Sequence, residues 1–270
     1  MAPSINIQSL SYQYFEEAPP ALRDVTLNIP SGSCAAVLGS AGAGKTTLLH
    51  ILSGILGSQF TTGKGKGAVT IGNKEFLPIP SRVLFPEVGY LMQDAPLQLS
   101  GIKETVAEEV AFTLDNMDIS GAERQRRVAE ILSTLTIGHL AHRKPTQLSG
   151  GELQRVALAS VLVAQPSFLL LDEPVNALDS LAQHTMTSLV RSLKGKTTVV
   201  IADSGIEFAL AAADLFLVLD AGQIVFSGTR RQFLDSLDMF SGHLSVVPWK
   251  EIVEQSKTMK INPRMSRVLN

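Results

Sequence analysis

One stretch near the N-terminus constrains the fold of this chain more than any other. Cys34–Leu38 is a continuous apolar run, typical of a strand buried on both faces, and residues 46–56 carry apolar side chains at helical spacing. Residues 39–46 between them read GSAGAGKT and match the pattern G-x-x-x-x-G-K-[ST]. Glycines let backbone N–H groups curl around a phosphate, and the helix N-terminus adds partial positive charge. The stretch therefore predicts a strand, a phosphate-binding loop and a helix.

Two side chains of this loop have predicted roles toward a nucleotide. Lys45 would reach the β- and γ-phosphates, and the Thr46 hydroxyl would ligate Mg²⁺. A merely flexible Gly/Ala loop is disfavoured, because the flanking strand and helix patterns are those that the motif requires. The candidate nucleotide-binding residues of this segment are Gly39, Ser40, Ala41, Gly42, Ala43, Gly44, Lys45, Thr46 and Thr47.

Strand and helix patterns alternate over the rest of the chain. Strand patterns cover residues 5–10, 21–29, 34–38, 68–71, 88–92, 168–171, 197–201, 215–219 and 224–226. Apolar residues recur at helical spacing over residues 46–56, 152–164 and 181–193. A further helical block is predicted from about residue 103 to 145, with Ile102 as the first apolar residue of its repeat. This alternation predicts an α/β fold with a mainly parallel sheet covered on both sides, and the first two strands read as a hairpin.

Composition excludes several classes of protein. Of the 270 residues, 45% are hydrophobic and 18% are charged, against about 25% charged in an average globular chain, so wholesale disorder is excluded. The net charge of −2 does not suggest a nucleic-acid binder. The single cysteine, Cys34, cannot form an internal disulfide, which fits a reducing compartment. The uncharged run 156–171 is too short to span a membrane, and the N-terminus has no signal-peptide pattern, so an intracellular protein is expected.

Two acidic residues follow the apolar strand pattern 168–171. Asp172 and Glu173 would lie at the carboxyl end of a strand, where open α/β sheets bind their ligands. Asp172 can hold Mg²⁺ through water, and Glu173 can orient or deprotonate the water that attacks the γ-phosphate. Such a pair alone is more often a strand end that meets solvent. Together with the phosphate loop it indicates a nucleoside triphosphatase.

Residues 148–155 read LSGGELQR and indicate which kind of nucleoside triphosphatase this is. This string resembles the LSGGQ signature of the ATP-binding cassette (ABC) family, with Glu152 at the usual Gln, a common variant. The resemblance implies that Ser149, Gly150, Gly151 and Glu152 complete the ATP site of an opposing cassette, so that ATP is clamped between two subunits. A capped helix start explains the serine and the glycines, but not the whole string.

Other residues of this chain resemble further sequence elements of the ABC family, and they occur in the same order as in the family. Tyr14 corresponds to the aromatic residue of the family that stacks on adenine, although a lone strand Tyr is more often packed in a core. Gln93 resembles the Q-loop glutamine, which contacts Mg²⁺ and the attacking water. Asp179 ends an Ala-Leu-Asp string that resembles the D-loop, preceded by Asn176 where Ser or Thr is usual.

The family's switch histidine, which contacts the γ-phosphate, is missing. Alignment places Ser204 at its position, after Asp203, and no histidine lies between His184 and His243. A serine hydroxyl can donate a hydrogen bond to phosphate, but it supplies no cation. Two alternatives follow: Glu173 and Mg²⁺ suffice and the site hydrolyses ATP, which we favour, or the site is degenerate and the chain lends its signature to a competent partner.

Residues 105–117, TVAEEVAFTLDNM, resemble the ATPases of energy-coupling factor (ECF) transporters, with Thr113 at a usual Gly. This resemblance implies uptake of a vitamin or a transition-metal ion by an assembly at the cytoplasmic face of the membrane. Its partners would be a second ABC ATPase subunit, a transmembrane coupling subunit and a membrane-embedded substrate-binding subunit. A cassette ATPase without a membrane partner is the alternative.

The resemblance sets expected domain boundaries. Residues 1–230 would form the ATPase domain, with a helical subdomain inserted at about 94–150, and residues 231–270 a C-terminal extension. That extension would contact anionic headgroups or the partner cassette, or would simply be a solvated end. Arg124, Arg126 and Arg127 alternate with acidic residues and are expected to form a solvated helix face rather than a nucleic-acid site.

Overall fold

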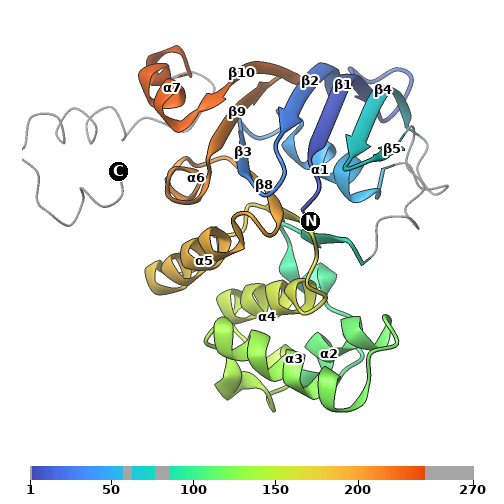
Figure 1. Ribbon diagram of the computed structural model, residues 1–270, viewed down its shortest axis with the longest axis vertical. Helices are drawn as coiled ribbons and strands as arrows, with labels where there is room; N and C mark the ends of the chain where they lie inside the picture. The colour runs from blue at the N-terminus through green and yellow to red at the C-terminus, as the bar shows by residue number, and fades with distance from the viewer. Residues whose placement is uncertain (1, 57–62, 77–85, 241–270) are drawn as a thin grey trace, which may run out of the picture.

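A six-stranded sheet forms the centre of the protein (Figure 1). The computed structural model describes residues 2–56, 63–76 and 86–240. Strand order in this sheet is β10-β9-β3-β8-β7-β6, and all neighbours are parallel except β9 and β10, which form an antiparallel pair. The strands are β3 (Cys34–Leu38), β6 (Val88–Leu91), β7 (Phe168–Asp172), β8 (Thr198–Asp203), β9 (Leu215–Asp220) and β10 (Gln223–Thr229). The expected mainly parallel sheet is confirmed.

Both faces of this sheet are buried. Every residue of β3 and of β7 is buried. Alternate side chains of β7 belong to different hydrophobic clusters: Leu169 and Leu171 pack on one face, Phe168 and Leu170 on the other. Strands covered on two sides read as continuous apolar runs, which is why the pattern in the sequence was strong.

One face packs on α1 (Lys45–Ser53) and a second sheet. That sheet is antiparallel and has the order β2-β1-β4-β5, so the expected hairpin is confirmed. Its strands are β1 (Ile5–Gln13), β2 (Leu22–Ile29), β4 (Lys64–Ile71) and β5 (Lys74–Phe76). Helix α1 ends earlier than the periodicity predicted, because Gly54 takes a left-handed conformation with φ 80° and caps it.

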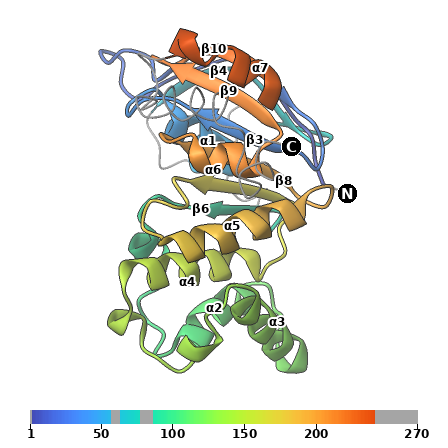
Figure 2. The same ribbon diagram turned by 90° about the vertical axis from the view of Figure 1, so that its left-hand side faces the viewer.

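The other face of the central sheet carries the remaining helices. Helix α4 (Gly150–Leu162) packs on it and also contacts α2 (Val106–Asp115) and α3 (Gly121–Thr134), so that these helices form a block at one end of the molecule (Figure 2). Short 3₁₀ turns η2 (Ala95–Gln98), η3 (Gly138–Leu140) and η4 (Pro145–Gln147) connect the block. Arg124, Arg126 and Arg127 form ion pairs with Asp115, Glu123 and Glu130. Arg126 is exposed, as expected of a solvated face, whereas Arg124 and Arg127 are partly buried.

The assignment of Ile102 to the helical repeat was wrong. Helix α2 begins only at Val106, because Thr105 caps it: the Thr105 hydroxyl accepts from the Glu108 N–H, and the Glu108 carboxylate accepts from the Thr105 N–H. Ile102 therefore lies in the preceding loop, where 73% of its surface is exposed.

Helices α5 (Ser180–Leu193), α6 (Glu207–Ala212) and α7 (Arg230–Asp235), with η5 (Leu237–Phe240), complete the fold. Phe233 of α7 is fully buried and stacks on Phe216 of β9, with ring centroids 4.7 Å apart. Residues 231–240 thus pack on the core, whereas the expectation for the rest of the extension concerns residues 241–270, which lie outside the described residues. No helix in the described part of the chain is long and apolar enough to span a bilayer.

Candidate nucleotide site

The glycine-rich loop connects the carboxyl end of β3 to the first turn of α1, as its sequence predicted. Gly42 and Gly44 have φ of 80° and 105°, a region that residues with a Cβ rarely adopt. Close approach adds a second requirement, since a Cβ on Gly39 would lie 2.3 Å from the Leu219 carbonyl oxygen and one on Gly44 2.5 Å from that of Ala21. The loop conformation is therefore available only to glycine at these positions.

Lys45 is buried against this loop, with 6% of its surface exposed. Its Nζ donates to the carbonyl oxygens of Gly39, at 2.8 Å, and Ser40, at 3.0 Å. Burial lowers the pKa of Lys45, while the carboxylates of Glu173, Asp172 and Asp203 act in the opposite direction. The Lys45 ammonium is thus held between the loop and three acidic side chains, where a phosphate could replace the two carbonyls.

Asp172, the last residue of β7, has an unsatisfied carboxylate oxygen. Its Oδ2 accepts from the Tyr90 hydroxyl at 3.3 Å and its carboxylate from the Thr46 hydroxyl, but within the described residues Oδ1 is buried without a hydrogen-bond partner. Burial raises the pKa of Asp172. A carboxylate beside a hydroxyl is the donor set that Mg²⁺ prefers, usually through retained waters, so these residues fit the metal.

Glu173 follows in a strained backbone conformation with φ 46°. Its N–H donates to the Ala202 carbonyl of neighbouring β8 at 2.8 Å, which fixes the turn. Its Oε2 accepts from the Gln93 side-chain amide at 2.8 Å and from the Asn176 side-chain amide at 2.6 Å. One carboxylate oxygen therefore joins the end of β6, the end of β7 and the segment before Asp179.

Tyr14 lies next to the phosphate loop, just beyond β1. Its hydroxyl is 3.0 Å from the Thr47 hydroxyl in α1, and its ring meets that of Tyr12 edge to face at 5.1 Å. The aromatic ring expected to stack on adenine and the helix expected to hold the phosphates are therefore in direct contact.

The signature residues form the N-terminus of α4 at an exposed position. The Ser149 hydroxyl accepts from the Glu152 N–H at 3.3 Å, and Glu152 Oε2 accepts from the Ser149 N–H and hydroxyl, each at 2.8 Å. These bonds lower the pKa of Glu152. No hydrogen bond in the described part of the chain links Ser149, Gly150 or Gly151 to the phosphate loop. The fold of one chain does not bring these two predicted halves of a site together.

Two further predicted residues stand at element ends. Asp179 is exposed and caps α5, accepting from the Ala182 N–H at 2.8 Å. Gly151 at the start of α4 lies against the segment before it, since a Cβ there would be 2.9 Å from the Ala177 carbonyl oxygen. The signature and the Ala-Leu-Asp segment thus form one surface.

Ser204 directly follows β8, at the same end of the sheet as Glu173, which follows the neighbouring parallel strand β7. The preceding Asp203 is 3% exposed and accepts from the Gly205 N–H at 2.9 Å. Burial first, and the nearby Glu173 carboxylate, raise the pKa of Asp203 to about 6. Ser204, at the position aligned with the missing histidine, therefore supplies no cation of its own and follows a buried acidic residue.

Sequence analysis missed two contributors. Tyr90 donates to Asp172, and Asn176 donates to Glu173. The signal for Tyr90 is its place in β6 opposite Leu170 of β7, which is visible only once the strand order is known. Asn176 was noted as a departure from the D-loop pattern, but nothing in the sequence indicated its partner.

Comparison with known proteins agrees with this geometry. The family model described as ABC transporter matches residues 22–176. The energy-coupling factor transporter ATP-binding protein EcfA1 of Levilactobacillus brevis is 36% identical over 233 residues, which cover 86% of this chain and 80% of that protein. A putative ABC transporter ATP-binding protein of Pyrococcus abyssi is 33% identical over 236 residues, covering 87% and 83% respectively.

Solved structures agree in fold. The structure of cbiO1 from Clostridium perfringens, described as part of the ABC transporter complex cbiONQ, superimposes with a TM-score of 0.75 at 27% identity over 98% of both chains. A dimeric ATP-binding cassette in a post-hydrolysis state bound to ADP and Pi gives a TM-score of 0.73 at 28% identity, over 83% of this chain and 98% of that one. The phosphate loop, the paired acids and these similarities lead to one conclusion: this chain belongs to the ABC transporter family, as an ATPase cassette of a transporter.

Proposed function

We propose that the chain is the ATP-hydrolysing subunit of an ECF-type importer, which energises uptake of a vitamin or a transition-metal ion from the cytoplasmic face of the membrane. The observation that carries the ATPase assignment is the Glu173 carboxylate, held by two side-chain amides beside the phosphate loop. The similarity to EcfA1 and to cbiO1 supports the importer class. In such an assembly, residues 94–150 would form the inserted helical subdomain and residues 231–270 the C-terminal extension.

Each residue of the site would have one task. Lys45 would exchange the Gly39 and Ser40 carbonyls for phosphate oxygens, and Tyr14 would stack on adenine. Mg²⁺, when bound with ATP, neutralises charge on the β- and γ-phosphates, and Thr46, Asp172 and Gln93 would hold it. Glu173 would orient the attacking water and accept its proton. Gln93 already donates a hydrogen bond to Glu173. A change at the nucleotide site that moves Glu173 would therefore also move Gln93 and the helical block that follows Gln93 in the chain.

The second half of the site would come from another cassette. Ser149, Gly150 and Gly151 are exposed or partly exposed at a helix N-terminus, where backbone N–H groups and the helix dipole favour an anion. A two-fold arrangement would place this N-terminus on the partner's ATP, with Asp179 at the same surface. The dimeric form of the similar cassette with ADP and Pi supports this arrangement.

The membrane partner would dock beside the Q-loop. Leu97 in η2 and Ile102 are exposed by 77% and 73%. Gln98, which follows Leu97 in the chain, lines a cavity of about 210 Å³ together with Tyr90 and Ser160. The buried carboxylate of Glu109 accepts from the Ser100 N–H at 2.5 Å and from the Ser100 hydroxyl at 2.8 Å, which fixes the loop that presents Ile102. Apolar side chains on a fixed loop suit a coupling helix from a transmembrane subunit.

This docking surface gives a prediction that tests the importer assignment. The double substitution Leu97→Asp with Ile102→Asp is expected to weaken co-purification with the membrane subunits at least tenfold, since burying each apolar side chain contributes about 1.5–3 kcal/mol. Val225→Asp, at an apolar residue of β10 exposed by 48%, is the matched control and should leave co-purification unchanged. Recovery of the unsubstituted chain without any membrane protein would instead indicate a cassette ATPase that works alone.

The degenerate-site alternative is kept because Ser204 stands where the family has a histidine. If the missing cation limits the rate, Ser204→His should raise ATP turnover by about tenfold, because a donor aimed at developing phosphate charge contributes strongly to catalysis. Ser204→Ala controls for loss of the hydroxyl. An unchanged rate in Ser204→His would mean that this site does not depend on a residue at position 204.

A further inference from the structure

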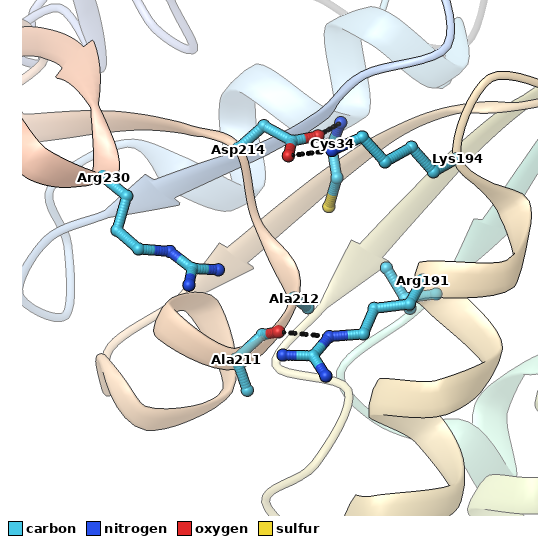
Figure 3. A pocket seen from close by; sticks show the side chains of 8 residues that line it. Cys34, Arg191, Lys194, Ala211, Ala212, Asp214 and Arg230 are labelled. Carbon is cyan, nitrogen blue, oxygen red and sulfur yellow. Dashed lines mark hydrogen bonds and ion pairs between the residues drawn. The ribbon is translucent and has the colours of Figure 1, made fainter. Parts of the chain in front are cut away.

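Two cavities of the protein differ in what their polar side chains join. The larger, of about 590 Å³, lies at the amino end of β3, whereas the phosphate loop follows the carboxyl end of this strand (Figure 3). In its lining, Asp214 pairs with Lys194 and accepts from the Cys34 N–H, so these groups join segments of the fold to one another. In the smaller cavity, of about 210 Å³, the polar side chain of Gln98 bonds to the strand that supplies two residues of the nucleotide site.

The Gln98 side chain completes the outer edge of β6. Within the part of the chain that the structure describes, β6 pairs only with β7 and is therefore an edge strand, with backbone groups left over on its other side. Gln98 Nε2 donates to the Tyr90 carbonyl at 2.6 Å, and Gln98 Oε1 accepts from the Met92 N–H at 3.0 Å. A carbonyl and the N–H two residues later point to the same side of a strand, so this amide pairs as the peptide group of a further strand would.

The stretch of backbone that Gln98 holds supplies two side chains to the nucleotide site. The Tyr90 hydroxyl donates to Asp172 at 3.3 Å, and Gln93, the residue after Met92, donates to Glu173 at 2.8 Å. Gln98 itself contacts neither carboxylate. A change in its two hydrogen bonds would reach both acids only through the position of the β6 backbone.

The other side of Gln98 is joined to the helical block. Leu99 alone separates it from Ser100, whose N–H and hydroxyl donate to the Glu109 carboxylate of α2 at 2.5 and 2.8 Å. Glu109 is 3% exposed, and a buried carboxylate that loses its donors is costly, so the loop is expected to move with α2. Leu97, exposed by 77%, directly precedes Gln98 on the proposed docking surface.

We propose that Gln98 is a positioning residue through which docking at Leu97 and movement of α2 act on the nucleotide site. A shift of α2 pulls Ser100, Gln98 follows, and the end of β6 moves so that Gln93 meets Glu173 at a different distance. This inference rests on the proposed function, because it requires a membrane partner at the docking surface and hydrolysis that depends on Glu173.

The test compares the full chain with Gln98→Met, which keeps the length and nearly the volume of the side chain but removes both amide groups. Hydrogen exchange without nucleotide, read in peptides that contain Met92, is expected to be about tenfold faster at its N–H, because this group loses its acceptor. Gln125→Met is the matched control. Gln125 is an exposed residue of α3 whose side chain makes no hydrogen bond within the described residues, so exchange at Met92 should stay unchanged.

Turnover and affinity separate positioning from a general loss of structure. Gln98→Met is expected to lower ATP turnover at saturating ATP about tenfold, since a small misplacement of reacting groups is costly, and to change ATP affinity by less than about twofold. In the membrane complex, Gln98→Met should co-purify normally, unlike the Leu97→Asp and Ile102→Asp pair. The ratio of turnover in the complex to turnover in the isolated chain should move toward one.

Four results would overturn the proposal. Exchange at Met92 could be equal in Gln98→Met and the unsubstituted chain, or faster with unchanged turnover. Turnover and ATP affinity could fall to the same extent, which indicates general loosening, or the ratio between complex and isolated chain could stay the same. Failure of the proposed function looks different: turnover of the unsubstituted chain would not depend on Glu173, or the chain would recover no membrane protein.

Discussion

Glu173→Gln is expected to lower ATP turnover by about a hundredfold or more while leaving ATP affinity nearly unchanged, since a positioned general base contributes about 10²–10⁴-fold. The substitution is close to isosteric. A glutamine carbonyl can still accept from the side-chain amides of Gln93 and Asn176, which now hold the carboxylate at 2.8 and 2.6 Å. What is lost is the negative charge and the ability to take a proton from water.

The measurement is steady-state phosphate release by the isolated chain and by its membrane complex, with ATP affinity measured separately. Asn176→Ala is a useful companion, because it removes one donor to Glu173 but leaves the base, so it should reduce turnover far less. Equal turnover in Glu173→Gln and the unsubstituted chain would reject catalysis by this site and favour the degenerate-subunit alternative.

Lys45→Ala is expected to weaken ATP binding by about a hundredfold. Lys45 is the cation nearest the loop carbonyls, and a charge-assisted hydrogen bond contributes about 1.5–3 kcal/mol. Its loss also removes the only side chain of this loop that can offset Asp172, Glu173 and Asp203 around a bound phosphate. The check is ATP binding by fluorescent-analogue displacement at constant Mg²⁺.

Lys66→Ala is the matched control for this substitution, because Lys66 is an exposed lysine of β4 and its loss should leave ATP affinity unchanged. Thermal unfolding without nucleotide separates a binding defect from a folding defect. Wild-type affinity in a folded Lys45→Ala protein would show that the lysine does not reach the phosphates and would contradict the proposed site.

Much of the fold was predictable, for identifiable reasons. The continuous apolar runs at β3 and β7 reflect burial on both faces, which few other structures require. Local capping chemistry limited the accuracy at element ends: Gly54 ends α1 early, and Thr105 starts α2 after Ile102. At a helix end, a single capping residue decides the boundary more than the spacing of apolar residues does, because the terminal N–H and C=O groups have no partner within the helix.

The sequence alone determined the phosphate loop, the paired acids and the signature, because backbone conformation and helix capping there depend on residue types close together in the chain. Only the tertiary structure decided how separate segments meet. The strand order brings Tyr90 to Asp172 and Gln93 to Glu173. Contacts between residues 80 or more positions apart depend on strand order and helix packing, which no short motif records.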